Sequence, residues 1–487
     1  MFIPAAEYRP DVADLNTAFS DEIRNVLVAD GSYIPAPSFR TLTDPIDGEP
    51  LGGISVKSLG GEILFFAGTA EKLWLLNGTT MEWDDVSQAA VTYDASRIAP
   101  WSFAAFGNFV IAVNQNNVPQ VMEIGVDVAF RDLGGSPPRA GIVKVWGSFV
   151  ALMRLTDNPN RVQWSGLEDC EYWTPGSSNS DYQDFPDGGA VQGSTEATNP
   201  LIFLESAIQR ATFVPGSAEI FTFQKIQDKR GVKAPRSIAS RGSFAFYADE
   251  GGFFQIGPDG AITPIGFEKV DRTVFGRLNA SSISRIVGAV DPFFSRVYWA
   301  IDYTGQDIYN EMLVYDWQLG KWTAIDVAAY GIFPLFTFGY TLDGLDAVSD
   351  NLDALPFSLD SKAWQGGAPL LASFTPDYRL AAFSGEPLEA IITTPEIGDT
   401  AGQVTRTTSS YPVVDADSVF VSVGVRMRRI QSEPVTWLPE VEPSYNTRRV
   451  RKVTRARFHR FRIRVPAAEV WSHIKGIDVD SAPAGSR

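Results

Sequence analysis

The stretch SLDSKAWQGGAPLLASFTPDYRLAAFSGEPLEAIITTPE, residues 358–396, separates two kinds of β pattern. Before it, apolar runs of four to seven residues alternate with Gly, Asn, Asp and Pro, and after it longer alternating runs such as Val419–Val425 begin. Short apolar runs bounded by turn residues are typical of many short strands. Because helical periodicity is rare in the chain, we predict an all-β protein whose architecture changes at this stretch.

Short corners recur through the part of the chain before this stretch. Asn77-Gly78, Gly107-Asn108 and Gly147-Ser148 each stand between two strand-like runs, and Gly and Asn suit such corners because they accept positive φ. Further corners follow at Glu205-Ser206, Arg241-Gly242 and Asp291-Pro292. The spacing gives a period of 40 to 50 residues with about four strands per unit, which is the signature of a β-propeller. A pair of β-sandwiches remains the alternative, since a period alone does not establish circular closure.

The same patterns divide the chain into three parts. Residues 1–45, rich in Pro, Asp and Ser, are predicted to form an extended arm that belongs to the C-terminal part. Residues 46–365 are predicted to form a propeller of six or seven blades, and residues 366–487 a platform domain built as a β-sheet or sandwich. The arm either packs on its own domain or reaches a neighbouring copy, and the residues leave both alternatives open.

The charge of the chain is strongly uneven. The net charge of −17 argues against a general nucleic-acid binder. From Arg426 to Arg464, however, twelve Arg or Lys residues face only three Glu residues, a local charge of +9 that leaves −26 for the remainder. We therefore expect one basic surface on an otherwise acidic molecule.

The end of this basic segment has a strand pattern in which apolar residues at 461, 463 and 465 alternate with arginines at 460, 462 and 464. A guanidinium group binds two carboxylate or phosphate oxygens at once. We predict that the arginines form an interface with acidic surface of a neighbouring subunit, and contact with passing DNA is the alternative. The residues predicted to form this interface are Arg448, Arg449, Arg451, Arg460, Arg462 and Arg464.

Catalytic chemistry has few residues to draw on. The chain has only His459 and His473, a single Cys170, and no HExxH, GxxxxGK[ST] or strand-associated GxGxxG motif. Ser358-Leu359-Asp360 followed by Trp364 partly resembles the Asp box of sialidase propellers, but it lacks the central Gly and occurs once. We predict no catalytic residue, no metal site and no cofactor, and a glycan-binding or glycan-degrading propeller remains the alternative.

Cysteine usage and hydropathy bear on the compartment. A single Cys170 excludes an intrachain disulfide framework and fits a protein made in a reducing cytoplasm. No stretch approaches the roughly 18 apolar residues that cross a bilayer. The sequence therefore predicts a protein that is not inserted into a membrane.

Three blocks carry a resemblance to a known family. PDVADLN with the following GSYIPAPSF, the block SLDSKAWQGGAPLLASFTPDYRLAAFSG with Glu396 close behind, and the ending FRIRVPAAEVWSHIKGIDVDSAPAGSR resemble the tail nozzle proteins of short-tailed bacteriophages, also described as tubular tail or DNA-stabilisation proteins. The resemblance covers both ends of the chain and reaches the propeller only through its architecture.

The resemblance implies a structural virion protein, made in the host cytoplasm and located in the tail. Six copies would form a ring or tube below the portal and adaptor proteins, retain packaged DNA and conduct it during ejection without specific recognition. Tail fibre or spike proteins are further partners that the resemblance allows. It supplies no catalytic residues.

Overall fold

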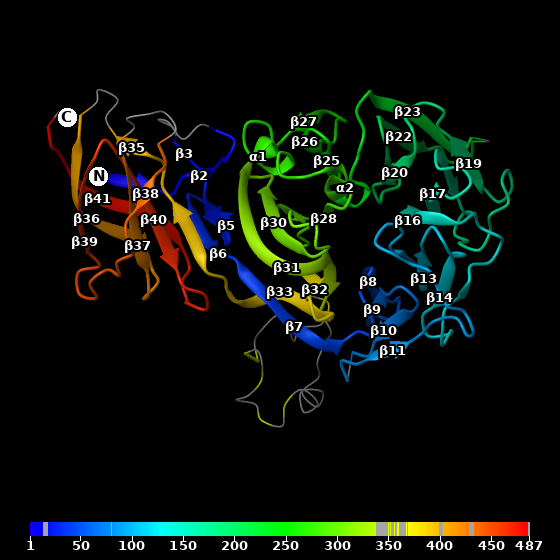
Figure 1. Ribbon diagram of the computed structural model, residues 1–487. Helices are drawn as coiled ribbons and strands as arrows, with labels where there is room; N and C mark the ends of the chain where they lie inside the picture. The colour runs from blue at the N-terminus through cyan, green and yellow to red at the C-terminus, as the bar shows by residue number, and fades with distance from the viewer. Residues whose placement is uncertain are drawn as a thin grey trace.

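The computed structural model describes residues 1–12, 18–78, 80–217, 219–337, 349, 351, 355, 358–359, 367, 369–398, 403–427 and 433–485. These residues form an all-β protein, as predicted. Its few helices are short: η1 (Pro235–Ser237), α1 (Asp271–Phe275) and α2 (Ala280–Ile283). Figure 1 shows two main bodies, a ring of small sheets at one side and a platform that carries both chain ends at the other.

Five four-stranded antiparallel sheets follow one another along the chain, each made of consecutive strands. The first is β8 (Gly52–Lys57), β9 (Ile63–Gly68), β10 (Leu73–Leu76) and β11 (Trp83–Asp85), and the second is β12 (Ser102–Phe106), β13 (Phe109–Val113), β14 (Gln120–Glu123) and β15 (Arg131–Asp132). The third is β16 (Ala140–Trp146), β17 (Phe149–Leu155), β18 (Arg161–Trp164) and β19 (Asp181–Asp184). The fourth is β20 (Val191–Ser194), β21 (Leu201–Leu204), β22 (Ala207–Phe213) and β23 (Phe221–Asp228), and the fifth is β24 (Ala239–Arg241), β25 (Phe244–Asp249), β26 (Gly252–Ile256) and β27 (Ile262–Pro264).

Two further blades share one long strand. The sixth blade contains β28 (Val287–Val290), β29 (Arg296–Ile301), β30 (Tyr309–Asp316) and the first half of β31 (Lys321–Phe336). The second half of β31 begins the seventh blade, which continues through β32 (Pro369–Phe374), β33 (Arg379–Pro387) and β7 (Pro37–Pro45). The strand bends where it passes from one blade to the next, at Gly331 with φ +73°, a conformation that glycine adopts without steric cost.

The ring closes between the seventh and the first blade. The amide of Phe336 in β31 donates to Ser55 Oγ of β8 at 3.0 Å. Phe65 and Trp74 of the first blade share a buried apolar cluster with Phe374 and Leu380 of the seventh. Seven blades around a closed ring confirm the predicted propeller, whereas a pair of sandwiches would not bring its first and last sheets together.

The predicted boundaries of the propeller need correction. The seventh blade takes β7 from the predicted arm, residues 1–45, and β32 and β33 from the predicted platform, residues 366–487. The propeller thus uses strands outside the predicted range 46–365, and the 365/366 boundary itself lies outside the described residues. This blade is completed by strands that are distant in sequence. The spacing of repeats along the chain does not show which distant strand pairs with which.

The hairpin corners test the turn predictions one by one. Gly107 and Gly147 have φ +60° and +62° and join strands that pair directly across the corner. The two-residue corner predicted at Asn77-Gly78 is wrong, because β10 and β11 are joined by residues 77–82, with Leu76 opposite Trp83. Asn77 Oδ1 accepts from the amide of Thr80 at 3.2 Å, so the Asn side chain closes a longer loop instead.

The platform is a sandwich of two sheets. One has the order β39 (Val450–Ala456), β36 (Thr405–Val414), β41 (Ile474–Pro483), β6 (Ser32–Pro35) and β5 (Val26–Ala29), with β1 (Phe2–Pro4) also paired to β41. The other has the order β4 (Ile23–Arg24), β34 (Ala390–Thr393), β40 (Phe458–Val465), β37 (Phe420–Arg426) and β38 (Thr436–Trp437), with β35 (Ile397–Gly398) on β40. Val423 and Phe461 of the second sheet share one buried cluster with Ile477 and Val479 of the first.

The predicted arm is built into this sandwich rather than extended away from it. Its strands β1, β5 and β6 join the first sheet and β4 joins the second, while β2 (Glu7–Tyr8) and β3 (Phe19–Ser20) form a short parallel pair. In these pairings β1, β4, β5 and β6 of the predicted arm lie with the C-terminal strands, whereas β7 belongs to the seventh blade.

Propeller and platform are joined by a continuous sheet. Ala324 of β31, in the sixth blade, pairs with Arg24 of β4, which belongs to the platform. Asn25 fastens this joint, because its side chain donates to Asp326 Oδ2 at 3.1 Å and to the carbonyl of Glu389 at 2.8 Å. Figure 1 shows the blades that contain β31, β32, β33 and β7 on the side of the ring nearest the platform.

Candidate functional site

The predicted arginine strip lies on β40, in the middle of the second platform sheet. Phe461, Ile463 and Val465 are buried in the sandwich core, which confirms the predicted alternation. Val465, Ile463 and Phe461 point inward because successive residues of a strand face opposite sides of the sheet. Arg460, Arg462 and Arg464, which alternate with them, therefore share the outer face of the sheet.

Arg460 and Arg462 are paired with acidic residues of the same chain. Arg460 is 5% exposed, donates to both carboxylate oxygens of Asp21, and also donates to the carbonyl of Thr394 at 3.1 Å. Arg462 donates through two nitrogens to Glu22 Oε2 at 2.7 and 2.9 Å and lies over the ring of Trp437. Both carboxylates come from the N-terminal 45 residues.

Arg464 completes this internal network. It forms ion pairs with Glu389 at 3.0 Å and with Glu440 at 2.7 Å, and its guanidinium group lies over the ring of Phe420. Hydrogen bonding from Arg464 lowers the pKa of Glu440. All three arginines of β40 are thus neutralised within the chain, so their predicted role in joining subunits would require these pairs to exchange partners.

The other three predicted interface residues lie beside the first platform sheet. Arg448 donates to the carbonyls of Asp417, at 3.0 Å, and Ala416. Arg449 donates to Ser409 Oγ at 2.8 Å and lies 3.7 Å from Asp480 Oδ2. Arg451 is exposed on β39, and within the described ranges no carboxylate lies at ion-pair distance from it.

Arg451 belongs to an exposed cationic surface, which we call the basic face. It consists of Arg406 on β36 with Arg451 and Arg455 on β39, and all three side chains are exposed. Arg406 and Arg455 stand directly opposite one another in the antiparallel pairing, an arrangement of like charges that destabilises a sheet. A surface that retains two opposed arginines has a net attraction for an anionic partner. Residue counting along the basic segment did not include Arg406, because it lies 20 residues upstream of Arg426.

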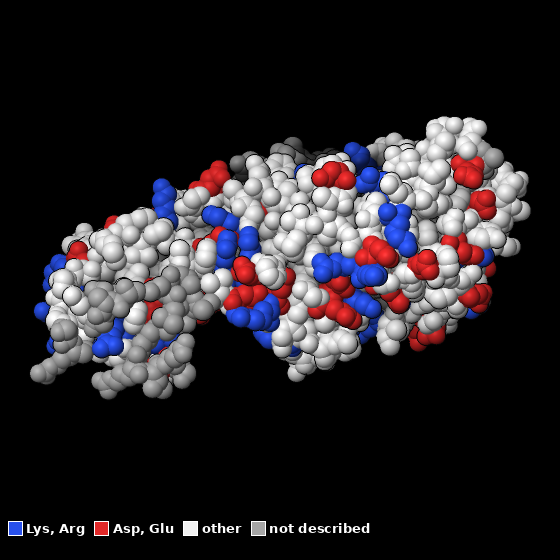
Figure 2. Space-filling model, turned by 90° about the horizontal axis from the view of Figure 1, so that it is seen from above, with Lys and Arg blue, Asp and Glu red and all other residues white. Residues whose placement is uncertain are grey.

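Elsewhere the surface carries mixed charge. Figure 2 shows acidic and basic side chains intermixed in a band over the middle of the molecule, on the face seen from above. The electric fields of intermixed opposite charges largely cancel, and salt screens what remains beyond a Debye length of about 8 Å at physiological ionic strength. This band therefore provides no strong field of a single sign.

The remaining candidate nucleophiles and ligands are held in structural roles. Burial raises the pKa of the Cys170 thiol to about 12 and lowers the pKa of His459 to about 4. His473 lies 3.6 Å from Asp415 Oδ2 in an exposed turn. Among the described residues there is no group of three or more His, Cys, Asp or Glu that could hold a metal ion. Asp360 and Trp364 of the stretch that resembles an Asp box lie outside the described residues.

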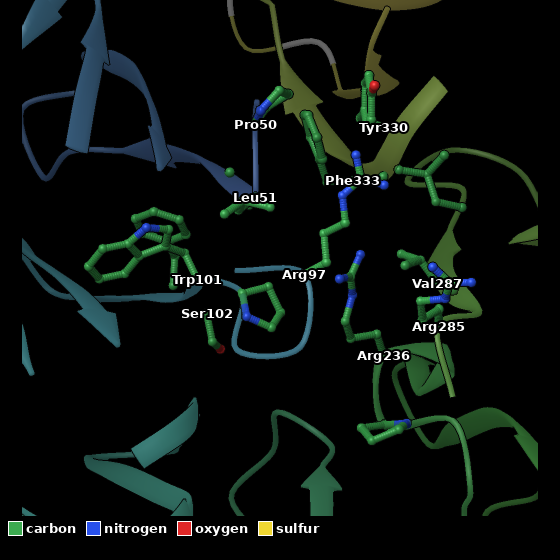
Figure 3. Close-up of a pocket in the computed structure, with 18 of the residues that line it drawn as sticks. Pro50, Leu51, Arg97, Trp101, Ser102, Arg236, Arg285, Val287, Tyr330 and Phe333 are labelled. Carbon is green, nitrogen blue, oxygen red and sulfur yellow. The ribbon is translucent and has the colours of Figure 1, made fainter. Parts of the chain in front are cut away.

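A second candidate site lies at the centre of the propeller, where the inner parts of all seven blades surround a cavity of about 300 Å³. Three arginines line it, and Figure 3 shows Arg97 and Arg236 extending into its middle, with Arg285 beside Val287 at the wall. Sequence reasoning missed these residues. Their common signal is position, since each lies a few residues before the innermost strand of its blade: β12, β24 and β28.

Comparison with known proteins gives little guidance. No family model and no curated protein matches the chain. Among solved structures, the computationally designed Ika8 protein is 10% identical with a TM-score of 0.39, covering 74% of this chain and 95% of its own. The extracellular domain of the putative one component system BT4673 from B. thetaiotaomicron is 11% identical with a TM-score of 0.42, covering 85% of this chain and 47% of its own. A protein from Lactobacillus plantarum is 13% identical with a TM-score of 0.37, covering 55% and 82%. None of these similarities informs the function.

One physical observation adds to these comparisons. Within the described parts of the chain, no helix is long and apolar enough to cross a membrane.

Proposed function

We propose that the chain is a structural protein of a bacteriophage tail: a nozzle subunit that forms a ring below the portal and adaptor, retains packaged DNA and conducts it during ejection. Copies of itself, adaptor or portal proteins, and tail fibre or spike proteins are its proposed partners, and DNA passes through the lumen without specific recognition. The protein is not an enzyme in this proposal.

The observation that carries the proposal is where the resembling blocks lie. GSYIPAPSF, residues 31–39, contributes to β6 and β7, and the described part of the central block forms β32 and β33. The ending FRIRVPAAEVWSHIKGIDVD contributes to β40 and β41. Segments that stand more than 300 residues apart thus pair with one another, β7 with β33 and β6 with β41. These segments thus lie in the seventh blade and in the platform, where Ile34 of β6 packs in one cluster with Leu371 of β32, and a shared docking function requires such proximity.

The basic face supplies the contact between neighbouring copies in this proposal. Its arginines are exposed, whereas those of β40 already have intrachain partners. A basic patch that meets acidic surface elsewhere on the next copy is a heterologous interface, and such interfaces close into rings when the rotation permits. The number six comes from the family resemblance and not from these charges.

Cryo-EM of the tail of the virus that encodes this chain tests the proposal. We expect six copies around the tail axis below the adaptor, with the basic face of each copy against acidic surface of the next. Absence of the chain from purified virions by mass spectrometry, or one central copy in the map, would overturn it.

A pair of variants tests the role of the basic face. Arg451→Glu/Arg455→Glu is expected to prevent ring assembly, because it reverses the charge of the proposed contact. Arg139→Glu reverses an exposed arginine of the propeller, outside the basic face, and should assemble like the wild type. Assembly should also weaken as salt rises. Equal incorporation of all three proteins into tails would show that the basic face is not the contact.

A further inference from the structure

The cavity of the propeller has charged residues at one end of its wall. The inner strands β8, β12, β24 and β28 all begin at this end, and the loop from β29 to β30 returns to it. Glu49, Arg97, Arg236, Arg285 and Asp307 lie in the segments just before these strands or in that loop, and all line the cavity. Topology thus brings residues from four separate blades into one site.

Arg97 and Arg285 are held in place by carboxylates. Arg97 forms ion pairs with Glu49 at 2.6 Å and with Asp307 at 3.2 Å. Arg285 forms an ion pair with the other carboxylate oxygen of Asp307. Asp302 Oδ2 also lies 3.9 Å from Arg285 Nη2, and the oxygens of Asp302 accept from the loop amides of Thr304, Gly305 and Asp307.

Arg236 is fixed differently. Its Nη2 donates to the hydroxyl of Tyr309 at 3.1 Å, and that hydroxyl donates in turn to the carbonyl of Arg285 at 2.9 Å. Across the described parts of the chain, no carboxylate lies at ion-pair distance from Arg236. The guanidinium group therefore stands in the middle of the cavity, oriented by a neutral partner and without a counter-charge (Figure 3).

Part of the cavity wall is apolar. Leu51, Trp101, Val287 and Phe333 line it, contributed by four different blades (Figure 3). Its volume of about 300 Å³ stands at the lower end of the range for small-molecule sites. A preformed cavity that combines one oriented polar group with apolar and aromatic walls is typical of a ligand site.

We infer that this cavity binds a small organic acid. A carboxylate or phosphate oxyanion of the ligand accepts from Arg236, and a compact ring body packs against the apolar wall. The oxyanion gives Arg236 the ion-pair partner that no described carboxylate provides, and the guanidinium fork suits two oxygens of one acid. Because Tyr309 already orients Arg236, binding costs little side-chain ordering. The inference does not depend on ring assembly.

Titration calorimetry with the purified full chain tests this inference with three probes. Benzoate carries both an oxyanion and a ring, benzamide keeps the ring without the charge, and inorganic phosphate keeps the charge without the ring. We expect benzoate to bind at least tenfold more tightly than either of the other two, and to bind more weakly as chloride rises. Equal affinity for benzoate and benzamide, phosphate binding tighter than benzoate, or no binding of benzoate would each overturn it.

Variants locate the site within the molecule. Arg236→Met is expected to weaken benzoate binding at least tenfold, whereas Arg139→Met, which changes an exposed arginine outside the cavity, should bind like the wild type. Arg236→Lys keeps the charge but loses the fork and should give an intermediate affinity, which also serves if Arg236→Met does not fold. Unchanged benzoate binding by either Arg236 variant would place the ligand elsewhere and sink the proposal.

Discussion

Arg426 and Glu396 form the most buried ion pair described in the platform. Two parallel contacts join them, Nε to Oε1 at 2.6 Å and Nη2 to Oε2 at 2.7 Å, and their side chains are 6% and 1% exposed. Such a pair costs desolvation, so its presence is weak evidence of a net gain in stability. Removal of one partner is different, because the remaining buried charge loses two charge-assisted hydrogen bonds.

Glu396→Leu is therefore expected to destabilise the platform by about 3 to 5 kcal/mol, measured as a shift of urea unfolding. The double variant Arg426→Met/Glu396→Leu should recover most of that loss, since it removes both charges. The exposed pair Lys72–Asp85 is the matched control, with a distance of 3.1 Å and exposures of 42% and 41%. Lys72→Ala should leave the urea unfolding midpoint almost unchanged, because solvent screens an exposed pair. A Glu396→Leu protein as stable as the Lys72→Ala protein would contradict this account.

Asp271, at the start of α1, gives the propeller a pH dependence. Burial raises the pKa of its carboxyl group to about 7, and the nearby charge of Asp11 also raises this pKa. The amide of Phe253 donates to the carboxyl group at 3.1 Å and lowers the pKa in part. In the unfolded chain the pKa of an Asp is about 3.9. The folded state therefore binds more protons between about pH 4 and pH 7, and its stability falls as pH rises through that window.

Asp271→Asn should remove this penalty, because it is neutral at every pH. At pH 8 we expect the free energy of unfolding of the variant, measured by urea denaturation, to exceed that of the wild type by at most about 4 kcal/mol. Near pH 4 the two free energies should be equal. The exposed Glu268→Gln is the control and should leave the pH profile unchanged. A wild type that becomes more stable relative to Asp271→Asn as pH rises would show that the sign is wrong.

Among the elements, β1 depends on a single glycine. Gly476 of β41 stands opposite Pro4 and has φ +149°, and an added Cβ there would lie 2.1 Å from the carbonyl oxygen of Ile3. The three nearest atoms, in Ile3, Pro4 and Ala5, are all backbone atoms, so no flexible side chain can move aside. The close approach of β1 to β41 therefore requires glycine at this position.

Gly476→Ala is expected to displace β1 from the sheet and to cost more than about 1 kcal/mol. Amide hydrogen exchange should increase at Phe2, Ile3 and Ala5, whose amide donates to the carbonyl of Lys475 at 2.8 Å, and stay unchanged in the propeller. Gly251→Ala is the control, since its added Cβ meets no atom within 4 Å, and it should change stability by less than about 0.5 kcal/mol. Protected β1 amides in the Gly476→Ala protein would contradict the steric argument.

Local patterns predicted the elements better than their partners. Gly107 and Gly147 revealed their hairpins because positive φ selects glycine, and the alternation at 461–465 revealed the buried face of β40. The same reasoning failed at Asn77, whose side chain closes a longer loop. It also missed the pairing of β7 with β33, because nothing local to residues 37–45 specifies a partner more than 300 residues away.

For the arginine sites too, sequence patterns predicted the residues better than their partners. The arginines at 460, 462 and 464 were recognised from their spacing, yet their partners Asp21, Glu22 and Glu389 are not near them in sequence. The positions of the exposed arginines of the basic face depend on the register between β36 and β39. The positions of the three cavity arginines depend on closure of the propeller ring. Neither register nor closure can be read from a run of residues, so charge counting located the basic region without showing which of its charges are unpaired.

At the scale of the whole molecule, the net charge of −17 and the continuous sheet through β31 and β4 bear on how DNA would pass. A conduit must not hold its cargo, and each phosphate neutralised by Lys or Arg adds salt-dependent affinity. A ring of six copies with the three β40 arginines facing DNA would present eighteen guanidinium groups. We therefore expect the lumen to be acidic, or neutral and polar, with these arginines remaining in protein contacts.

Duplex binding by the purified chain measures how many arginines are free. If only the three arginines of the basic face reach phosphates, the slope of log affinity against log salt is no steeper than about −3. Glu22→Gln/Glu389→Gln/Glu440→Gln removes the carboxylates that pair with Arg462 and Arg464, so this variant should bind a 30-base-pair duplex more tightly at low salt and with a steeper slope. Glu62→Gln, exposed on the propeller, is the control and should change neither quantity. A wild-type slope steeper than about −5 would mean that the paired arginines already reach DNA, and the protein would then grip the genome rather than let it slide.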